Sequence, residues 1–169
     1  MAGVPHSPTP MRLNLEDLAL RGGQRHESAY SADIAPVLLG GVPYQVLLAD
    51  GVGVAVDRVA GGFLIRLTMD ARVYGPCARC LQEVDFGVRA EQEEFAPTAA
   101  GGWAVSESSA FIHDLGVDIG GMAREALVLA LPTQVLCSPS CRGLCPQCGW
   151  GLNQGTCECG ALEISEPMR

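Results

Sequence analysis

The cysteines are the residues of this chain with the clearest capacity for chemistry, because all eight of them fall in two short segments. The first segment holds one Cys-x-x-Cys pair, and the second holds six cysteines near the end of the chain. Two thiolates separated by two residues can bind one zinc ion from a single turn, and a tetrahedral structural site needs two such pairs. The spacing therefore predicts one or two zinc ions, bound by Cys77, Cys80, Cys137, Cys141, Cys145, Cys148, Cys157 and Cys159.

The pairing of these cysteines can be predicted from the tail. The run Cys145-Pro-Gln-Cys148-Gly149 has the composition of a zinc-knuckle turn, since Pro fixes one dihedral and Gly lets backbone amides point at sulfur. We expect one site to contain Cys145, Cys148, Cys157 and Cys159. The second site would contain the other four, Cys77, Cys80, Cys137 and Cys141. A swapped pairing, or one zinc with spare thiols, fits the same spacing, and iron accepts the same ligands.

Disulfide and redox chemistry are the alternatives to a metal. Residues 1–8 have no basic or long apolar stretch, so no secretory signal is visible, and we expect a cytoplasmic protein with reduced thiols. No window has the roughly 18 apolar residues that a membrane-spanning helix needs. Thiol-disulfide exchange by Cys145 and Cys148 remains the main rival function, because their spacing also fits a redox pair. Such a pair normally opens a helix, which Gly149, Gly151 and Gly155 disfavour.

No catalytic constellation accompanies the cysteines. A zinc hydrolase or deaminase needs an open coordination position and a nearby general base, often in a His-x-Glu sequence. His6, His26 and His113 stand alone, and none is followed by Glu two residues later. The serines near residues 106–109 lack the flanking glycines of a nucleophile elbow. The sequence therefore predicts that the protein is not an enzyme and has no small-molecule substrate.

The elements that would position the first cysteine pair are β-strands. Residues 63–74 alternate between apolar and polar side chains, as do residues 52–57 and 84–90, and this period of two is typical of half-buried strands. Cys77 and Cys80 thus fall in the connection of an antiparallel hairpin, which would hold their sulfurs at a fixed separation. The polar, glycine-rich residues 21–31 are typical of a loop.

One helix is expected near the second cysteine segment. Asp118 is a candidate N-cap for a helix over 118–131, with apolar residues at helical spacing and Pro132 after its end. The apolar face predicts packing on the sheet. The expected fold class is α+β: a mainly antiparallel β-sheet, a packed C-terminal helix and a small cysteine-rich zinc-binding tail. The predicted organisation is a mobile N-terminus at 1–10, a β-rich core domain at 11–134, a cysteine-rich zinc-binding segment at 135–160 and a mobile tail at 161–169.

The charge of the chain bears on its partners. The formal net charge is −8, and all eleven basic residues are scattered arginines, which disfavours sequence-independent binding of nucleic acid. A basic protein partner fits better, and its candidate docking surface is the acidic run with Glu91, Glu93 and Glu94. Direct phosphate contacts would instead use the arginines near the cysteines, namely Arg72, Arg79 and Arg142.

Three motifs together resemble the YceD family, whose members are known as large ribosomal RNA subunit accumulation proteins. They are Cys77-Ala-Arg-Cys80-Leu-Gln-Glu-Val after a strand, Asp118-Ile opening a helix that ends Leu129-Ala-Leu-Pro132, and the run from Leu136-Cys-Ser-Pro-Ser-Cys to Gly-Trp-Gly-Leu-Asn153. The resemblance covers roughly residues 11 to 160.

This resemblance implies a role in assembling the large ribosomal subunit or in accumulating its 23S rRNA. The implied partner is a large-subunit precursor, contacted through a basic ribosomal protein or through rRNA. The genes of family members lie beside the gene of a small zinc-ribbon protein of that subunit. Some members lack the cysteines that match Cys145 onward while keeping the first pair, which implies that these last cysteines form a separable site.

Overall fold

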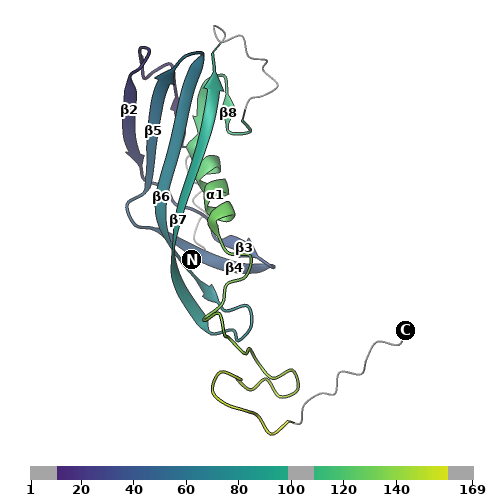
Figure 1. Cartoon of the computed structure of the whole chain (residues 1–169). Helices are drawn as coiled ribbons and strands as arrows, with labels where there is room; N and C mark the ends of the chain where they lie inside the picture. Colours follow the sequence, from purple (N-terminus) through teal and green to yellow (C-terminus); the bar gives the residue numbers. More distant parts are fainter. Residues whose placement is uncertain (1–10, 99–108, 160–169) are drawn as a thin grey trace, which may run out of the picture.

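The computed structural model describes residues 11–98 and 109–159, and its longest elements are the two strands of one β-hairpin. Strands β6 (Gly62–Pro76) and β7 (Glu83–Pro97) pair antiparallel along their whole length, from Gly62 opposite Pro97 to Pro76 opposite Glu83. The hairpin runs the length of the sheet, and its connection lies at the end next to the cysteine-rich segment (Figure 1). The first cysteine pair therefore lies at the tip of the longest hairpin.

The second edge of β6 is shared by two shorter strands. Strand β5 (Val52–Val59) pairs with the first half of β6, and β4 (Val42–Leu48) pairs with the second half. Strand β2 (Arg25–Tyr30) lies outside β5, and β3 (Val37–Leu39) lies outside β4. The result is one antiparallel sheet of six strands in the described part of the chain.

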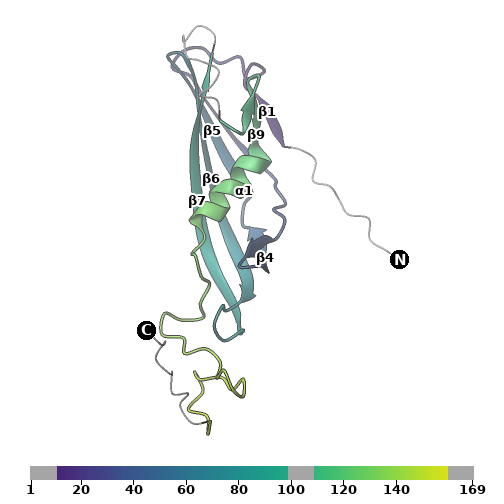
Figure 2. The same ribbon diagram turned by 90° about the vertical axis from the view of Figure 1, so that its right-hand side faces the viewer.

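A small second sheet leads into the helix. It contains β1 (Arg12–Asn14), β9 (Gly116–Asp118) and β8 (Ile112–His113), in the order β1-β9-β8. Helix α1 (Ile119–Ala130) follows β9 directly, and the side chain of Asp118 caps it by accepting a hydrogen bond from the Gly121 N–H at 3.0 Å. The helix lies over one face of the large sheet, along β7 (Figure 2).

The core lies between this face of the sheet and α1. The strands contribute alternating apolar side chains, among them Val52, Val54, Val56, Ile65, Leu67 and Val73. The helix contributes one buried stripe, formed by Ile119, Met122, Ala123, Ala126 and Leu127. Burial of these side chains removes apolar surface from water and is the main stabilising contribution to the fold. A separate small cluster contains three of the cysteines, Cys77, Cys80 and Cys141, packed against Val84, Leu136 and Leu144.

The mainly antiparallel sheet with one packed helix confirms that part of the expected fold class, and α1 agrees with the helix expected at 118–131. The loop expected at 21–31 is wrong, because β2 occupies residues 25–30. Strand β2 is an edge strand whose inward positions include His26 and Ser28, so it lacks an apolar period. Arg25 binds Glu27 at 2.7 Å and Asp57 at 3.5 Å on the outward face.

The mobile ends expected at 1–10 and 161–169 lie outside the described residues, and the domain limit at 134 stays a prediction. In the described ranges, no helix is both long enough and apolar enough to cross a membrane.

Candidate metal centres

The eight cysteine sulfurs gather into two groups of four, and the Sγ atoms within each group lie within 4.8 Å of one another. The first group, called the hairpin site, contains Cys77, Cys80, Cys137 and Cys141. The second group, called the tail site, contains Cys145, Cys148, Cys157 and Cys159. This grouping is the one that the spacing predicts, whereas binding of a metal by these sulfurs stays a prediction. Both groups lie at the lower end of the molecule, at and below the tip of the β6–β7 hairpin (Figure 1).

The hairpin turn fixes the first two sulfurs. Cys77 follows the last residue of β6, and its N–H donates to the Gln82 carbonyl at 2.8 Å while its carbonyl accepts from the Leu81 N–H at 3.0 Å. The N–H of Arg79 points at Cys77 Sγ at 3.4 Å. Leu81, which follows Cys80, has a φ of 61°. This left-handed backbone conformation costs free energy in any residue with a Cβ atom. The turn has the backbone of a knuckle although Leu81 replaces the usual glycine.

The segment after α1 lies directly against this turn. The Val135 carbonyl accepts from the Ala78 N–H at 2.8 Å, and the Arg79 guanidinium donates to the Cys141 carbonyl at 3.0 Å. Gly143, with a φ of +77°, comes so close that an added Cβ would lie 3.1 Å from the Arg79 carbonyl oxygen. Hydrogen bonds and close packing thus bring the second cysteine pair to the first.

The separations between sulfurs in the hairpin site fit a metal better than a disulfide. Cys77 Sγ and Cys141 Sγ lie 3.8 Å apart, and Cys80 Sγ and Cys137 Sγ lie 3.5 Å apart. A disulfide needs about 2.05 Å between sulfurs. A tetrahedron with Zn–S bonds of about 2.3 Å has edges of about 3.8 Å. The donor set and its dimensions therefore fit zinc, and iron accepts the same ligands.

A side chain from the tail also contacts the hairpin site. The amide Nδ2 of Asn153 donates to Cys141 Sγ at 3.3 Å and is 3.8 Å from Cys137 Sγ. Its Oδ1 accepts from the Arg142 N–H at 2.7 Å, which fixes the orientation of the amide. Sequence reasoning missed Asn153, because a single amide five residues after Cys148 follows no ligand spacing.

The tail site is built on a second knuckle. Leu144 and Gly151 form an isolated antiparallel bridge. Within it, the Cys145 N–H donates to the Trp150 carbonyl at 2.8 Å, and the Gly149 N–H donates to the Cys145 carbonyl at 2.9 Å. Gly149 has a φ of 72°, as expected for the glycine of a knuckle. In the described residues α1 ends at Ala130, so Cys145 does not open a helix as the thiol of a redox pair normally does.

Backbone amides favour ionisation of Cys145 in the tail site and of Cys77 in the hairpin site. The N–H groups of Cys148 and Gln147 lower the pKa of Cys145 to about 6. Burial opposes ionisation of Cys77, but hydrogen bonds from backbone amides, that of Arg79 first, outweigh it and lower its pKa to about 6. The lowered pKa favours the thiolate form of both side chains, which is the form that binds a metal.

Another thiol in each site, Cys137 or Cys159, resists ionisation. The side chain of Cys141 is the largest cause that raises the pKa of Cys137 to about 12, and the side chain of Cys148 has the same effect on Cys159. Four thiolates at these separations repel one another, so a divalent cation would be needed to hold all four in the charged form. The electrostatics of both sites therefore fit a metal with four thiolate ligands.

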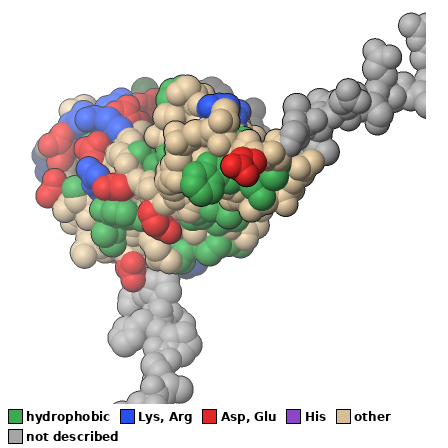
Figure 3. All heavy atoms as spheres, turned by 90° about the horizontal axis from the view of Figure 1, so that it is seen from below, with side chains coloured by type: hydrophobic (Ala, Val, Ile, Leu, Met, Phe, Trp, Pro, Cys, Tyr) green, Lys and Arg blue, Asp and Glu red, His purple; other side chains and the backbone are tan. Residues whose placement is uncertain are grey.

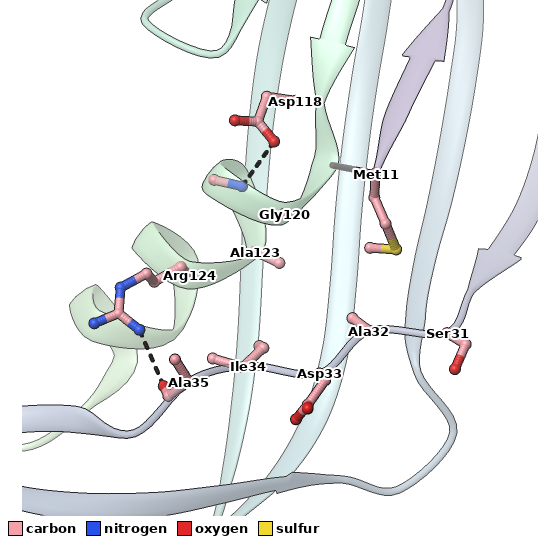
Figure 4. Close-up of a pocket in the computed structure, with 11 residues that line it drawn as sticks. Met11, Ser31, Ala32, Asp33, Ile34, Ala35, Asp118, Gly120, Ala123 and Arg124 are labelled. Carbon is pink, nitrogen blue, oxygen red and sulfur yellow. Dashed lines mark hydrogen bonds between the residues drawn. The ribbon is translucent and has the colours of Figure 1, made fainter. Parts of the chain in front are cut away.

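A cavity of about 590 Å³ lies away from the cysteines, between the start of α1 and residues 31–35 (Figure 4). Of its three charged residues, Asp33, Asp118 and Arg124, the last two form hydrogen bonds within the fold. Asp118 caps α1, and Arg124 donates to the Ala35 carbonyl at 3.0 Å. Small side chains form most of the remaining wall, so the cavity offers no set of reactive or ligating groups.

The predicted acidic docking surface lies on β7 and is partly neutralised there. Arg66 pairs with Glu93 at 2.8 Å, and Arg89 pairs with Glu91 at 2.9 Å. Glu94 accepts from the Gln92 amide at 2.8 Å. Viewed from below, acidic and basic side chains lie beside one another on one side of the molecule (Figure 3). Local pairing thus reduces the attraction of this run for a basic partner.

The three arginines proposed for phosphate contacts have different environments. Arg72 forms an ion pair with Asp85, and Arg79 binds the Cys141 carbonyl. Arg142 is exposed, beside the hairpin site. Two of the three arginines are therefore engaged in contacts within the chain.

The same cysteine-containing region matches a known family. Residues 65–167 match the family model described as large ribosomal RNA subunit accumulation protein YceD. Uncharacterized proteins of Mycobacterium tuberculosis and Mycobacterium bovis are each 32% identical to the chain over 150 residues, which is 85% of this chain and 72% of the relative. No solved structure matches the chain significantly.

Proposed function

The chain belongs to the YceD family, and from this membership we propose that it is a non-catalytic, zinc-binding factor in large ribosomal subunit assembly, needed for accumulation of 23S rRNA. The observation that carries the proposal is that the family match spans both four-cysteine sites. The description of the family as large ribosomal RNA subunit accumulation proteins supports the ribosomal role, and the geometry of the sulfurs supports the binding of zinc.

A structural role for zinc is supported by the ligand sets. Each site has four thiolates, and neither group includes a histidine or a carboxylate among the described residues. A tetrahedral site with four protein ligands leaves no open position for water or substrate. When bound, zinc would supply a cross-link, which at the hairpin site joins the tip of the β6–β7 hairpin to the chain after α1.

We propose a cytoplasmic large-subunit precursor as the partner, contacted through a basic ribosomal protein. The formal charge of −8 supports this choice, because charge complementarity speeds association with basic proteins and opposes contact with phosphates. Since Glu91 and Glu93 are paired within the sheet, the attraction would come from the charge of the whole chain. Direct contact with rRNA is the second possibility.

The ribosomal role is tested by deleting the gene in its own host. We expect less 23S rRNA relative to 16S rRNA, fewer large subunits in a sucrose gradient, and full rescue by the wild-type chain. The double variant Cys77→Ser/Cys80→Ser should not rescue, whereas Gly87→Ala, which changes an exposed position on β7, should rescue fully. An unchanged ratio of 23S to 16S rRNA in the deletion strain would contradict the proposal.

The partner is tested by capture of the tagged chain after nuclease treatment. Retention of a basic ribosomal protein would support the protein partner, and loss of all ribosomal components would favour rRNA. Raising the salt concentration should weaken either complex, because both depend on charge.

The metal is tested by elemental analysis of protein purified without added metal. We expect two zinc ions per chain and eight thiols released by a chelator. Iron would be detected in the same measurement. Metal-free protein with a reversible Cys145–Cys148 disulfide would favour the redox alternative instead.

A further inference from the structure

We propose that Asn153 couples the two cysteine sites, so that metal bound at the tail site raises the affinity of the hairpin site for its own metal. This inference rests on the proposal that both sites bind zinc. It assigns to Asn153 the role of a positioning residue, which acts on the metal through the sulfurs.

The contacts of Asn153 cross from one site to the other. It lies in the chain between the two cysteine pairs of the tail site, Cys145/Cys148 and Cys157/Cys159. Its amide nevertheless donates to a sulfur of the hairpin site, Cys141 Sγ, at 3.3 Å, with Cys137 Sγ at 3.8 Å. The residue that adjusts one site is therefore held on a loop that belongs to the other.

The amide is suited to stabilising a metal bound by thiolates. Four thiolates around Zn²⁺ carry a net charge of −2, and hydrogen bonds from neutral donors to the sulfurs reduce their mutual repulsion. Such partners of metal ligands typically change metal affinity 10- to 100-fold. Because the Asn153 Oδ1 accepts from the Arg142 N–H at 2.7 Å, the donor face of the amide is directed at the sulfurs.

The position of Asn153 depends on the closure of the tail loop. On one side, the Leu152 N–H donates to the Gly143 carbonyl at 2.9 Å, which completes the small hairpin around the second knuckle. On the other side, residues 154–156 are exposed and lead to Cys157. A metal held by Cys148 and Cys157 would close this loop from both ends. Without this metal the loop is free to move, and ordering Asn153 against the sulfurs then costs more conformational entropy. The hydrogen bonds from Asn153 to sulfur would therefore be formed for a smaller fraction of the time.

The first experiment measures metal affinity of the full chain by competition with a chelator. Co²⁺ is the probe, because its absorption bands report tetrahedral thiolate coordination directly and zinc affinity follows from displacement. Because both sites offer four sulfurs, the affinity of the tail site is first measured alone in Cys77→Ser/Cys80→Ser. In Asn153→Ala we then expect affinity at the hairpin site to fall 10- to 100-fold. The matched control Gln154→Ala changes the next, exposed residue and should leave the affinity within about threefold of wild type.

A second variant separates the donor role from a loop-shaping role. Asn153→Asp keeps an oxygen for the Arg142 N–H but replaces the donor with a carboxylate that repels thiolates. We expect it to bind metal at the hairpin site at least as weakly as Asn153→Ala. If Asn153→Asp retained wild-type affinity, Asn153 would only shape the loop, and the inference would be wrong.

The coupling itself is measured with a double-mutant cycle. The tail site is removed by Cys157→Ser/Cys159→Ser, in chains with Asn153 and with Asn153→Ala. We expect tail-site removal to weaken the hairpin site about 10-fold or more when Asn153 is present, and by less than about threefold when it is absent.

The outcomes distinguish this inference from the proposal on which it rests. Two metals that bind with independent affinities would overturn the coupling while leaving the zinc proposal intact. An equal loss in both Asn153 backgrounds would also overturn it, because another route would then connect the sites. If neither site bound Co²⁺ or Zn²⁺ in the wild-type chain, the zinc proposal itself would fail.

Discussion

The position of Cys77 depends on residues that carry no chemistry of their own. The ring of Tyr44, which is 2% exposed, lies over the backbone at Gly75, and an added Cβ there would overlap ring carbons of Tyr44. The Tyr44 hydroxyl donates to the Pro76 carbonyl at 2.7 Å, one residue before Cys77. Gly75 is thus required by space, and the ring fixes the end of β6 from which the first thiol extends.

We predict that Gly75→Ala destabilises the chain by about 1–3 kcal/mol, because the Tyr44 ring must move and its hydrogen bond to Pro76 weakens. Gly87→Ala is the matched control, since no atom lies within 4 Å of the added Cβ on β7, and its effect should stay within about 0.5 kcal/mol. Urea unfolding of the zinc-loaded protein measures both. Equal midpoints for the two variants would show that the contact with Tyr44 is unimportant.

At the scale of single residues, the sequence reveals the candidate metal ligands better than the residues that support them. The spacing of the cysteines predicted the grouping that the structure shows, although it also fitted a swapped pairing. Tyr44 and Asn153 act across 32 and 12 positions, on Pro76 and Cys141, and no periodicity links such distant positions. Their roles depend on three-dimensional packing and could not be predicted from the sequence.

Secondary-structure elements were predictable where one face is apolar. Apolar residues recur at every second position in strands β5 and β6 and at helical spacing in α1. These apolar side chains form the core. Strand β2 was missed because its inward positions are partly polar at the edge of the sheet. Strand β3, Val37–Leu39, is too short for a period to show.

The packing of α1 on the sheet gives a prediction at this scale. Leu127 is fully buried, whereas Leu129, two residues later, is 74% exposed. We predict that Leu127→Ala lowers the free energy of unfolding by about 2–5 kcal/mol, because it leaves a cavity in the core.

Leu129→Ala is the control for helix propensity and size, and its effect should stay within about 0.5 kcal/mol. Thermal unfolding followed by circular dichroism compares the two variants. A similar loss for both would mean that the inner face of α1 does not contribute more than its outer face.

In the part of the chain that the structure describes, the buried apolar side chains form two clusters, and Val84 packs against both. The main core involves the sheet and α1, and the smaller cluster contains Cys77, Cys80 and Cys141. A domain core of this kind can remain folded when a small metal-held segment opens. Removal of metal should therefore affect residues 136–159 much more than the sheet.

Trypsin can test this, because the eleven basic residues are all arginines and one of them, Arg142, lies between the two cysteine sites. We predict that the zinc-loaded chain resists cleavage after Arg142, because the Arg142 N–H donates to Asn153 Oδ1 and the Gly143 carbonyl accepts from the Leu152 N–H. A chelator should make this bond labile. Mass spectrometry would detect the fragment beginning at Gly143.

The bonds after Arg66 and Arg72, within β6, provide the internal control. They should stay resistant with and without the chelator, because strand pairing on both edges protects them. Rapid cleavage there after chelation would mean that the sheet itself depends on metal.

The two cysteine sites differ in how far along the chain their ligands are spread. Cys77 and Cys141 are 64 positions apart and Cys80 and Cys137 are 57 apart, whereas the tail site lies wholly within residues 145–159. Bringing distant residues together costs more entropy and is slower than closing a short loop. During synthesis, the β6–β7 hairpin emerges from the ribosome well before Cys137 does. A nascent or truncated chain that ends before residue 137 holds only half of the hairpin ligands, so a filled hairpin site would mark a chain that has been translated through its cysteine-rich segment and has folded.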